Sequence, residues 1–124
     1  MNAIRRLPDS ELEVMQAVWA FGEKAPRALV EDKVHESSDL AQTTILTLLS
    51  RLSDKGFIKA EKQGRSSVYT PLVSREEYLA AQSRSLFEKL CGGSVPVFAS
   101  ALADSGISRE DLKELKDLLE RGLI

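Results

Sequence analysis

The residues with the clearest potential chemistry lie in the stretch 38–69, where short side chains recur at helical spacing. Thr43, Leu46, Thr47, Ser50 and Asp54 fall at i, i+3, i+4, i+7 and i+11, so a helix carries them on one stripe, and four of the five are polar and short. Small side chains allow a helix to approach another surface closely, and a helix of this kind fits the major groove of DNA. The stripe therefore predicts a DNA-reading helix.

Position along this helix and side-chain chemistry divide the candidate residues into two groups. We assign to base edges the residues in the first half of the helix, namely Gln42, Thr43, Leu46 and Thr47. Glutamine forms a bidentate pair with adenine, and methyl groups pack on thymine. We assign to the DNA backbone or minor groove a second set, namely Ser50, Arg51, Lys55, Lys62 and Arg65. Arg51 lies to the side of the stripe, so an intramolecular salt bridge is its alternative role.

The elements around this stripe predict a winged helix. The opposite face of the helix is apolar and is expected to be buried, with Ile45, Leu48, Leu49 and Leu52. Lys55-Gly56 ends the helix, and residues 57–61 and 67–70 have strand composition around a turn at 62–65. Pro71 ends the pairing because it has no N–H to donate.

Two further helices are predicted before the reading helix, which completes a helix-turn-helix. The first is expected to be capped by Asp9 or Ser10, with a capping box over residues 10–13. Its predicted buried face is Leu12, Met15, Val18 and Trp19, where Trp19 packs in the core and does not stack on bases. The second helix has Pro26 in its first turn and runs to about residue 35, with Leu29, Val30 and Val34 as apolar positions.

The C-terminal part reads as three amphipathic helices without a sheet. Capping boxes at 74–77 and 108–111 open the first and last of them, and Pro96 lies in the first turn of the short middle one. A small winged helix cannot cover all their apolar faces, which favours packing against a second copy of the chain, with an intramolecular helical cap as the alternative. The residues assigned to dimerisation are Leu79, Leu86, Phe87, Leu90, Leu112, Leu115 and Leu119.

The predicted fold class is mainly α with a small β wing. It consists of a winged helix-turn-helix DNA-binding domain over residues 1–73 and a helical dimerisation region over residues 74–124. The net charge is −2, but residues 40–72 hold five cations and two anions, so positive charge gathers around the reading helix and wing.

Composition argues against several other function classes. With one cysteine (Cys91) and one histidine (His35), the sequence offers no thiolate or histidine cluster for a metal, and we expect no cofactor. No catalytic grouping of Ser, His and Asp, phosphate loop or paired carboxylates is apparent, so we expect no enzyme. The sequence has no apolar run of membrane-spanning length and no signal peptide, so we expect a cytoplasmic protein. A winged-helix module that binds proteins in place of DNA is the alternative function.

The motifs over residues 11–19, 44–56, 65–69 and 87–93 resemble the penicillinase repressor family (BlaI/MecI type) of winged-helix transcriptional repressors. The resemblance covers nearly the whole chain, and residues 44–56 are its most specific part. It implies a homodimeric repressor on double-stranded operator DNA that overlaps promoters. In the penicillinase branch, a membrane-bound sensor leads to proteolytic cleavage in the dimerisation region, so the resemblance also implies a signal-linked protease as partner.

Three departures limit what the resemblance implies. The paired Cys-x-Cys motifs of the copper-responsive branch are absent, since Cys91 stands alone. Leu46 occupies a position where some members have a basic residue, so base preference cannot be transferred. The segment 98–102, which corresponds to the cleaved region, is rich in Ala and Ser and has no obvious cut site. Ligand binding or redox chemistry at Cys91 therefore stay open beside proteolysis as the means of release.

Overall fold

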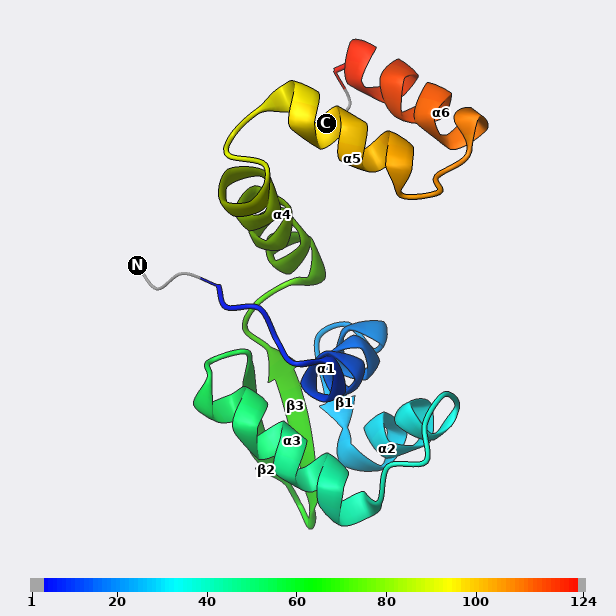
Figure 1. Ribbon diagram of the computed structural model, residues 1–124. Coiled ribbons are helices and arrows are strands. Elements are labelled where there is room, and N and C mark those ends of the chain that lie inside the picture. Colours follow the sequence, from blue (N-terminus) through cyan, green and yellow to red (C-terminus); the bar gives the residue numbers. More distant parts are fainter. Residues whose placement is uncertain (1–3, 123–124) are drawn as a thin grey trace. The chain divides into compact units, whose positions relative to one another are not determined.

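The computed structural model describes residues 4–122, which form two compact units, the first ending at Gln82 and the second beginning at Ser83. In the first unit, helices pack around a small antiparallel sheet (Figure 1). Its elements are α1 (Asp9–Ala20), β1 (Ala25–Pro26), α2 (Arg27–His35), α3 (Gln42–Asp54), β2 (Ile58–Gln63), β3 (Ser66–Pro71) and the first turns of α4 (Arg75–Ser85). The predicted fold class, mainly helical with a β wing, is confirmed.

Helix α1 begins two residues earlier than a cap at Ser10 requires, and one residue earlier than a cap at Asp9 requires. Its N-cap is Pro8, which makes no side-chain hydrogen bond, and the Pro8 carbonyl accepts from the Leu12 N–H at 2.9 Å. The predicted cap at Asp9 or Ser10 is therefore wrong, because both residues already lie inside the first turn. Proline suits a helix start, where its missing N–H would have no intrahelical partner.

The core of the first unit forms where α1 and α3 meet over the sheet. The predicted apolar stripe of α3 is confirmed, since Ile45, Leu48, Leu49 and Leu52 are all buried. They meet Val14, Met15 and Val18 of α1 and Val30 and Val34 of α2 in one cluster. A single polar side chain, Glu11 on α1, is buried among these described residues.

An aromatic group centred on Tyr78 joins α4 to this core. The ring centroid of Tyr78 lies 5.6 Å from that of Trp19 and 5.9 Å from that of Phe57. Trp19 donates from its indole nitrogen to the Val73 carbonyl at 2.9 Å, so its predicted role in core packing is confirmed. Because Tyr78 is buried here, the first compact unit continues past residue 73, where the predicted DNA-binding domain ends.

Strand β1 was not predicted from the sequence. Ala25 and Pro26 pair with Tyr69 and Val68 of β3, which gives the strand order β1-β3-β2. Pro26 therefore ends an edge strand and precedes α2, where it was expected inside the first turn of that helix. Leu29 is 45% exposed, against its predicted apolar position. It precedes Val30 by one residue, which turns it about 100° away from the buried face.

The predicted wing is the antiparallel hairpin of β2 and β3. Its register runs from Ile58 opposite Pro71 to Gln63 opposite Ser66. The pairing thus includes Pro71, one residue beyond its predicted end. Gly64 opens the two-residue loop with a φ of 63°, as a type II′ turn requires at its first loop position. This tight turn fixes the register of the wing.

The capping box before α4 is confirmed in both directions. The Ser74 N–H donates to a Glu77 carboxylate oxygen, and the Glu77 N–H donates to the Ser74 hydroxyl oxygen, both at 3.0 Å. Hydrogen bonds from the Ser74 backbone and side chain hold the pKa of Glu77 below its ordinary value. Helix α4 therefore starts at a fixed point, directly after the wing.

The second unit contains the end of α4, a π-helical turn η1 (Leu86–Leu90), α5 (Val95–Asp104) and α6 (Arg109–Glu120). The predicted helices are present, and the π-helical turn is an addition to them. Ser94 and Ser108 cap α5 and α6 by accepting from the N–H groups of Val97 and Asp111. The reciprocal Asp111 bond of the predicted second capping box does not form within residues 4–122. The rings of Phe87 and Phe98 pack edge to face.

Within the part of the chain that the structure describes, no single helix is long and apolar enough to cross a membrane. The bent pair formed by Arg75–Leu90 and Val95–Asp104 passes the same test jointly, on length and composition alone.

Candidate nucleic-acid interface

The outer face of α3 carries the predicted reading residues. Thr43, Thr47 and Ser50 are exposed, and Leu46 is half-buried. At about 100° per residue, Thr43, Thr47, Ser50 and Asp54 lie close to the line opposite the buried stripe. The centre of the solvent-facing side of α3 is therefore made of short side chains and ends in one carboxylate.

The flanks of α3 hold the remaining predicted residues. The same helical count turns Gln42 roughly 110° from the centre of the outer stripe, toward one edge of the helix. Arg51 lies on the other edge, seven residues after Thr44 and therefore in line with it. Thr44 is exposed and was not predicted to be a site residue. Its i, i+7 spacing to Arg51 could have placed it on the same edge of the helix in advance.

Thr47 makes a hydrogen bond that restricts its hydroxyl group. Its Oγ1 donates to the Thr43 carbonyl at 3.0 Å, within the same helix. The hydroxyl proton is therefore occupied, while the methyl group and the oxygen lone pairs remain for another partner. The Thr47 methyl group can therefore pack on a thymine methyl, and its hydroxyl oxygen can accept a hydrogen bond from a base amino group.

The two cations at the end of α3 differ in their surroundings. Arg51 is exposed, and within residues 4–122 no carboxylate lies within ion-pair distance of it. Lys55 donates from Nζ to the carboxylate of Glu11 at 2.5 Å. The Glu11 side chain is only 4% exposed. Lys55 thus neutralises a buried charge on α1, a role that the sequence did not reveal.

The wing carries further positive charge after α3. In the view of Figure 1, the hairpin loop and the first turn of α3 reach the same end of the first unit. Lys62 and Arg65 are exposed, and neither has an ion-pair partner within the described part of the chain. Lys59 lies near Glu61, with 3.9 Å between Nζ and the carboxylate. The two wing cations without an ion-pair partner in the described part of the chain, Lys62 and Arg65, are therefore the two that were predicted to contact DNA.

The loop between α2 and α3 is fixed by a histidine. The Nε2 atom of His35, the last residue of α2, lies at hydrogen-bonding distance, 2.8 Å, from the Leu40 carbonyl. This contact restrains the chain two residues before α3 begins. Within residues 4–122, no group of three or more His, Cys, Asp or Glu side chains is placed to hold a metal ion.

The predicted dimerisation residues lie on the helices after the wing and are poorly covered within one chain. Leu79, Leu86, Leu90 and Leu119 are exposed, with Leu90 reaching 78%, and Phe87, Leu112 and Leu115 are half-buried. Cys91 is the only buried side chain among residues 83–122. The second unit therefore does not build a closed core from its own side chains.

The sequence of this chain is similar to known proteins over most of its length. The sequence profile of the penicillinase repressor family matches residues 7–121. The chain is 30% identical over 121 residues to the penicillinase repressor of Bacillus licheniformis, covering 97% of this chain and 94% of that protein. It is 40% identical over 111 residues to an uncharacterised 16.5 kDa protein of Latilactobacillus sakei, covering 89% of this chain and 75% of the relative.

A solved structure matches the winged-helix architecture. It is the Bacillus licheniformis BlaI protein in its monomeric form, in complex with the blaP half-operator, with 35% identity and a TM-score of 0.53. The match covers 63% of this chain and 94% of the solved one. Because the family profile spans nearly all described residues and the fold agrees, this chain belongs to the penicillinase repressor family.

Proposed function

We propose that this chain is a transcriptional repressor that binds double-stranded operator DNA as a homodimer. The observation that carries the proposal is the outer face of α3, with short polar side chains along its centre, together with the cations of the wing that follows it. A protein-binding face would instead offer large apolar or aromatic anchors. Family membership and the half-operator complex of the BlaI relative support the same function.

The residues divide into three roles. Thr43, Leu46 and Thr47 meet base edges, with Gln42 reaching them from the flank, while Ser50, Arg51, Lys62 and Arg65 contact the backbone or minor groove. Lys55 mainly positions the end of α3, because its ammonium group is engaged by Glu11. The methyl groups of Thr43, Leu46 and Thr47 and the amide of Gln42 favour A·T pairs. We therefore propose that the half-site core is rich in A·T.

Dimerisation belongs to the helical region over residues 74–124. A second copy would cover the apolar side chains that one chain leaves exposed, and its two-fold axis would match a palindromic operator. The chain would act in the cytoplasm, without enzymatic activity, and a signal-linked protease is one proposed means of its release from the operator, beside ligand binding and redox chemistry at Cys91.

The test is binding of the purified chain to DNA upstream of its own gene and to a scrambled duplex, across a salt series. We expect a palindromic footprint on the upstream DNA alone, with a slope of log affinity against log salt of about −6 to −9. Equal affinity for both duplexes would contradict sequence-specific binding. Absence of binding at low salt would favour the protein-interaction alternative.

Thr47→Ala is expected to weaken the specific complex by about 1–3 kcal/mol while leaving non-specific binding unchanged, because only base contacts are lost. Thr44→Ala is the matched control, since Thr44 has the same side chain on the same helix but lies on its flank. Fluorescence anisotropy on specific and scrambled duplexes measures both. Equal losses on both duplexes would remove Thr47 from the base-reading set.

Asp54→Asn is expected to raise affinity for non-specific DNA about fivefold at low salt, on the scale of one Coulomb contact of about 1 kcal/mol in water. The carboxylate lies on the outer face of α3, where it repels phosphates. Asp104→Asn is the control, because Asp104 is exposed and also ends a helix, α5. A gain of the same size in the Asp104 variant would show that overall charge, not the place of Asp54, is responsible.

A further inference from the structure

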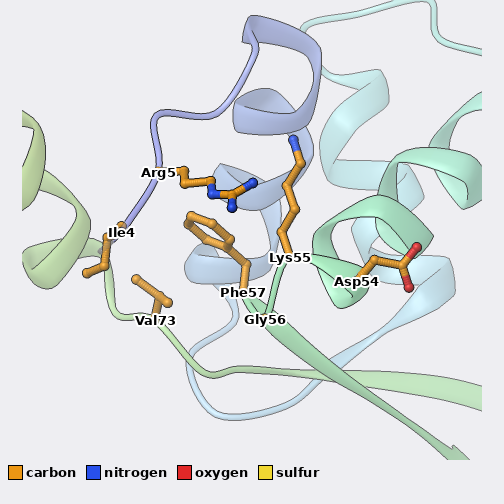
Figure 2. A pocket seen from close by; sticks show the side chains of 7 residues that line it. All are labelled: Ile4, Arg5, Asp54, Lys55, Gly56, Phe57 and Val73. Carbon is orange, nitrogen blue, oxygen red and sulfur yellow. The ribbon is translucent and has the colours of Figure 1, made fainter. Parts of the chain in front are cut away.

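A cavity of about 640 Å³ lies in the first unit, beside the C-terminal end of α3 (Figure 2). Its walls come from the N-terminal arm, from the end of α3 with the start of the wing, and from the chain after β3. The lining residues are Ile4, Arg5, Asp54, Lys55, Gly56, Phe57 and Val73. The volume is within the range of small-molecule sites, about 300–1,000 Å³.

Positive charge converges on one side of this cavity. Figure 2 shows the side chains of Arg5 and Lys55 on the same side, next to the ring of Phe57, whereas the Asp54 carboxylate points away from them. Within residues 4–122 no carboxylate lies within ion-pair distance of Arg5. Lys55 gives one of its three donors to Glu11. Both cations therefore retain donors for an anion.

Three apolar residues, Ile4, Phe57 and Val73, also line the cavity. Phe57 is buried, with 2% of its surface exposed, and Ile4 and Val73 are partly buried against the same core. A ligand that fills this space therefore needs a charged head and an apolar body. We propose that the cavity binds a small organic carboxylate, whose head group lies between Arg5 and Lys55 and whose body contacts the partly exposed Ile4 and Val73.

The walls of the cavity are held in place before any ligand arrives. Leu7, two residues after Arg5, is buried and donates its backbone N–H to the Tyr78 hydroxyl oxygen at 2.8 Å. The Phe57 carbonyl accepts from the N–H groups of Leu72 and Val73, at 2.8 and 3.4 Å. A preformed site loses less conformational entropy on binding than a mobile one.

The cavity is connected to the proposed reading helix. Asp54 is the last residue of α3, and Lys55 ties that end of the helix to Glu11 on α1. A bound carboxylate shares Lys55 with Glu11 and adds negative charge beside the DNA-facing side. We expect such a ligand to lower DNA affinity, a consequence that rests on the proposed function, whereas carboxylate binding itself does not.

The test uses the full-length chain labelled with nitrogen-15 and two probe pairs without DNA, phenylacetate with phenylacetamide and 4-methylpentanoate with its amide. We expect saturable shifts of the Gly56, Phe57 and Val73 amide signals by at least one carboxylate, with a Kd of about 1–10 mM. The matched amide should bind at least about tenfold more weakly, because a neutral amide accepts a hydrogen bond but cannot form an ion pair with a guanidinium group.

Arg5→Gln separates the proposed site from general charge attraction. We expect it to weaken the carboxylate about tenfold and to leave the amide unchanged. Arg6→Gln is the matched control, since Arg6 is an exposed neighbour outside the lining, and it should change neither probe. Equal binding of acid and amide, equal effects of the two variants, or no saturation by about 50 mM in either pair would overturn the proposal.

A DNA titration with the binding carboxylate then distinguishes the two proposals. If the carboxylate reduces the DNA affinity of the wild type but not that of Arg5→Gln, the result supports coupling between the cavity and DNA binding. A chain that binds the carboxylate and fails to bind DNA would contradict the proposed function alone.

Discussion

Lys55→Ala is expected to destabilise the first compact unit by about 3 kcal/mol, the lower end of the range for breaking a buried ion pair. The substitution leaves the Glu11 carboxylate, which is 4% exposed, without its cation. The lower end applies because the Lys55 side chain is 31% exposed. Water can therefore enter its place and partly solvate the Glu11 carboxylate. Urea unfolding followed by fluorescence measures the loss, and Trp19, the only tryptophan, lies in this unit.

Two variants control for other effects of removing a lysine. Lys59→Ala removes an exposed lysine whose partner, Glu61, is also exposed, so it should change stability by less than about 1 kcal/mol. Adding Glu11→Gln to Lys55→Ala should recover much of the lost stability, because the buried group is then neutral. Equal losses for Lys55→Ala and Lys59→Ala would contradict the structural role of the Glu11–Lys55 pair.

Leu90→Asp is expected to convert the proposed dimer into a monomer and to lower operator affinity about 100-fold or more, because two linked half-site contacts become independent. Leu90 is 78% exposed within one chain, so folding of the single chain should not suffer. Sedimentation velocity measures the oligomeric state, and anisotropy on full and half operators measures the affinity. Half-site affinity should remain unchanged.

Leu72→Asp is the control for the dimer experiment. Leu72 is also exposed and apolar, at 55%, but it lies directly after β3 in the first unit. It should leave the oligomeric state as it is. A Leu90→Asp protein that sediments like the wild type would contradict the assignment of the C-terminal helices to dimerisation.

The sequence predicted those elements whose residues repeat regularly over several turns or strand positions. The buried stripe of α3 and the hairpin with glycine in its turn are local patterns, and both were found in the structure. Strand β1 could not be found this way, because it has two residues and forms only by pairing with β3. The start of α1 was misplaced because Ser10 fits a capping box as well as a first turn.

Long-range contacts within the site were also beyond local patterns. Glu11 and Lys55 are 44 positions apart, so neither sequence spacing nor composition reveals their pairing. The same holds for the cavity, whose lining comes from three separate segments. The outer face of α3 could be described in advance because one helix carries it, and its contacts with DNA remain predictions.

The contact between Leu7 and Tyr78 sets an order of events during synthesis of the chain. The two residues are 71 positions apart, so this hydrogen bond cannot hold the N-terminal arm until Tyr78 has left the ribosome. The β2–β3 hairpin can close on its own within about 1–10 μs, whereas translation adds only about 5–20 residues per second. The wing is therefore ready long before the arm docks, and the cavity walled by Ile4 and Arg5 is among the last features of the first unit to form.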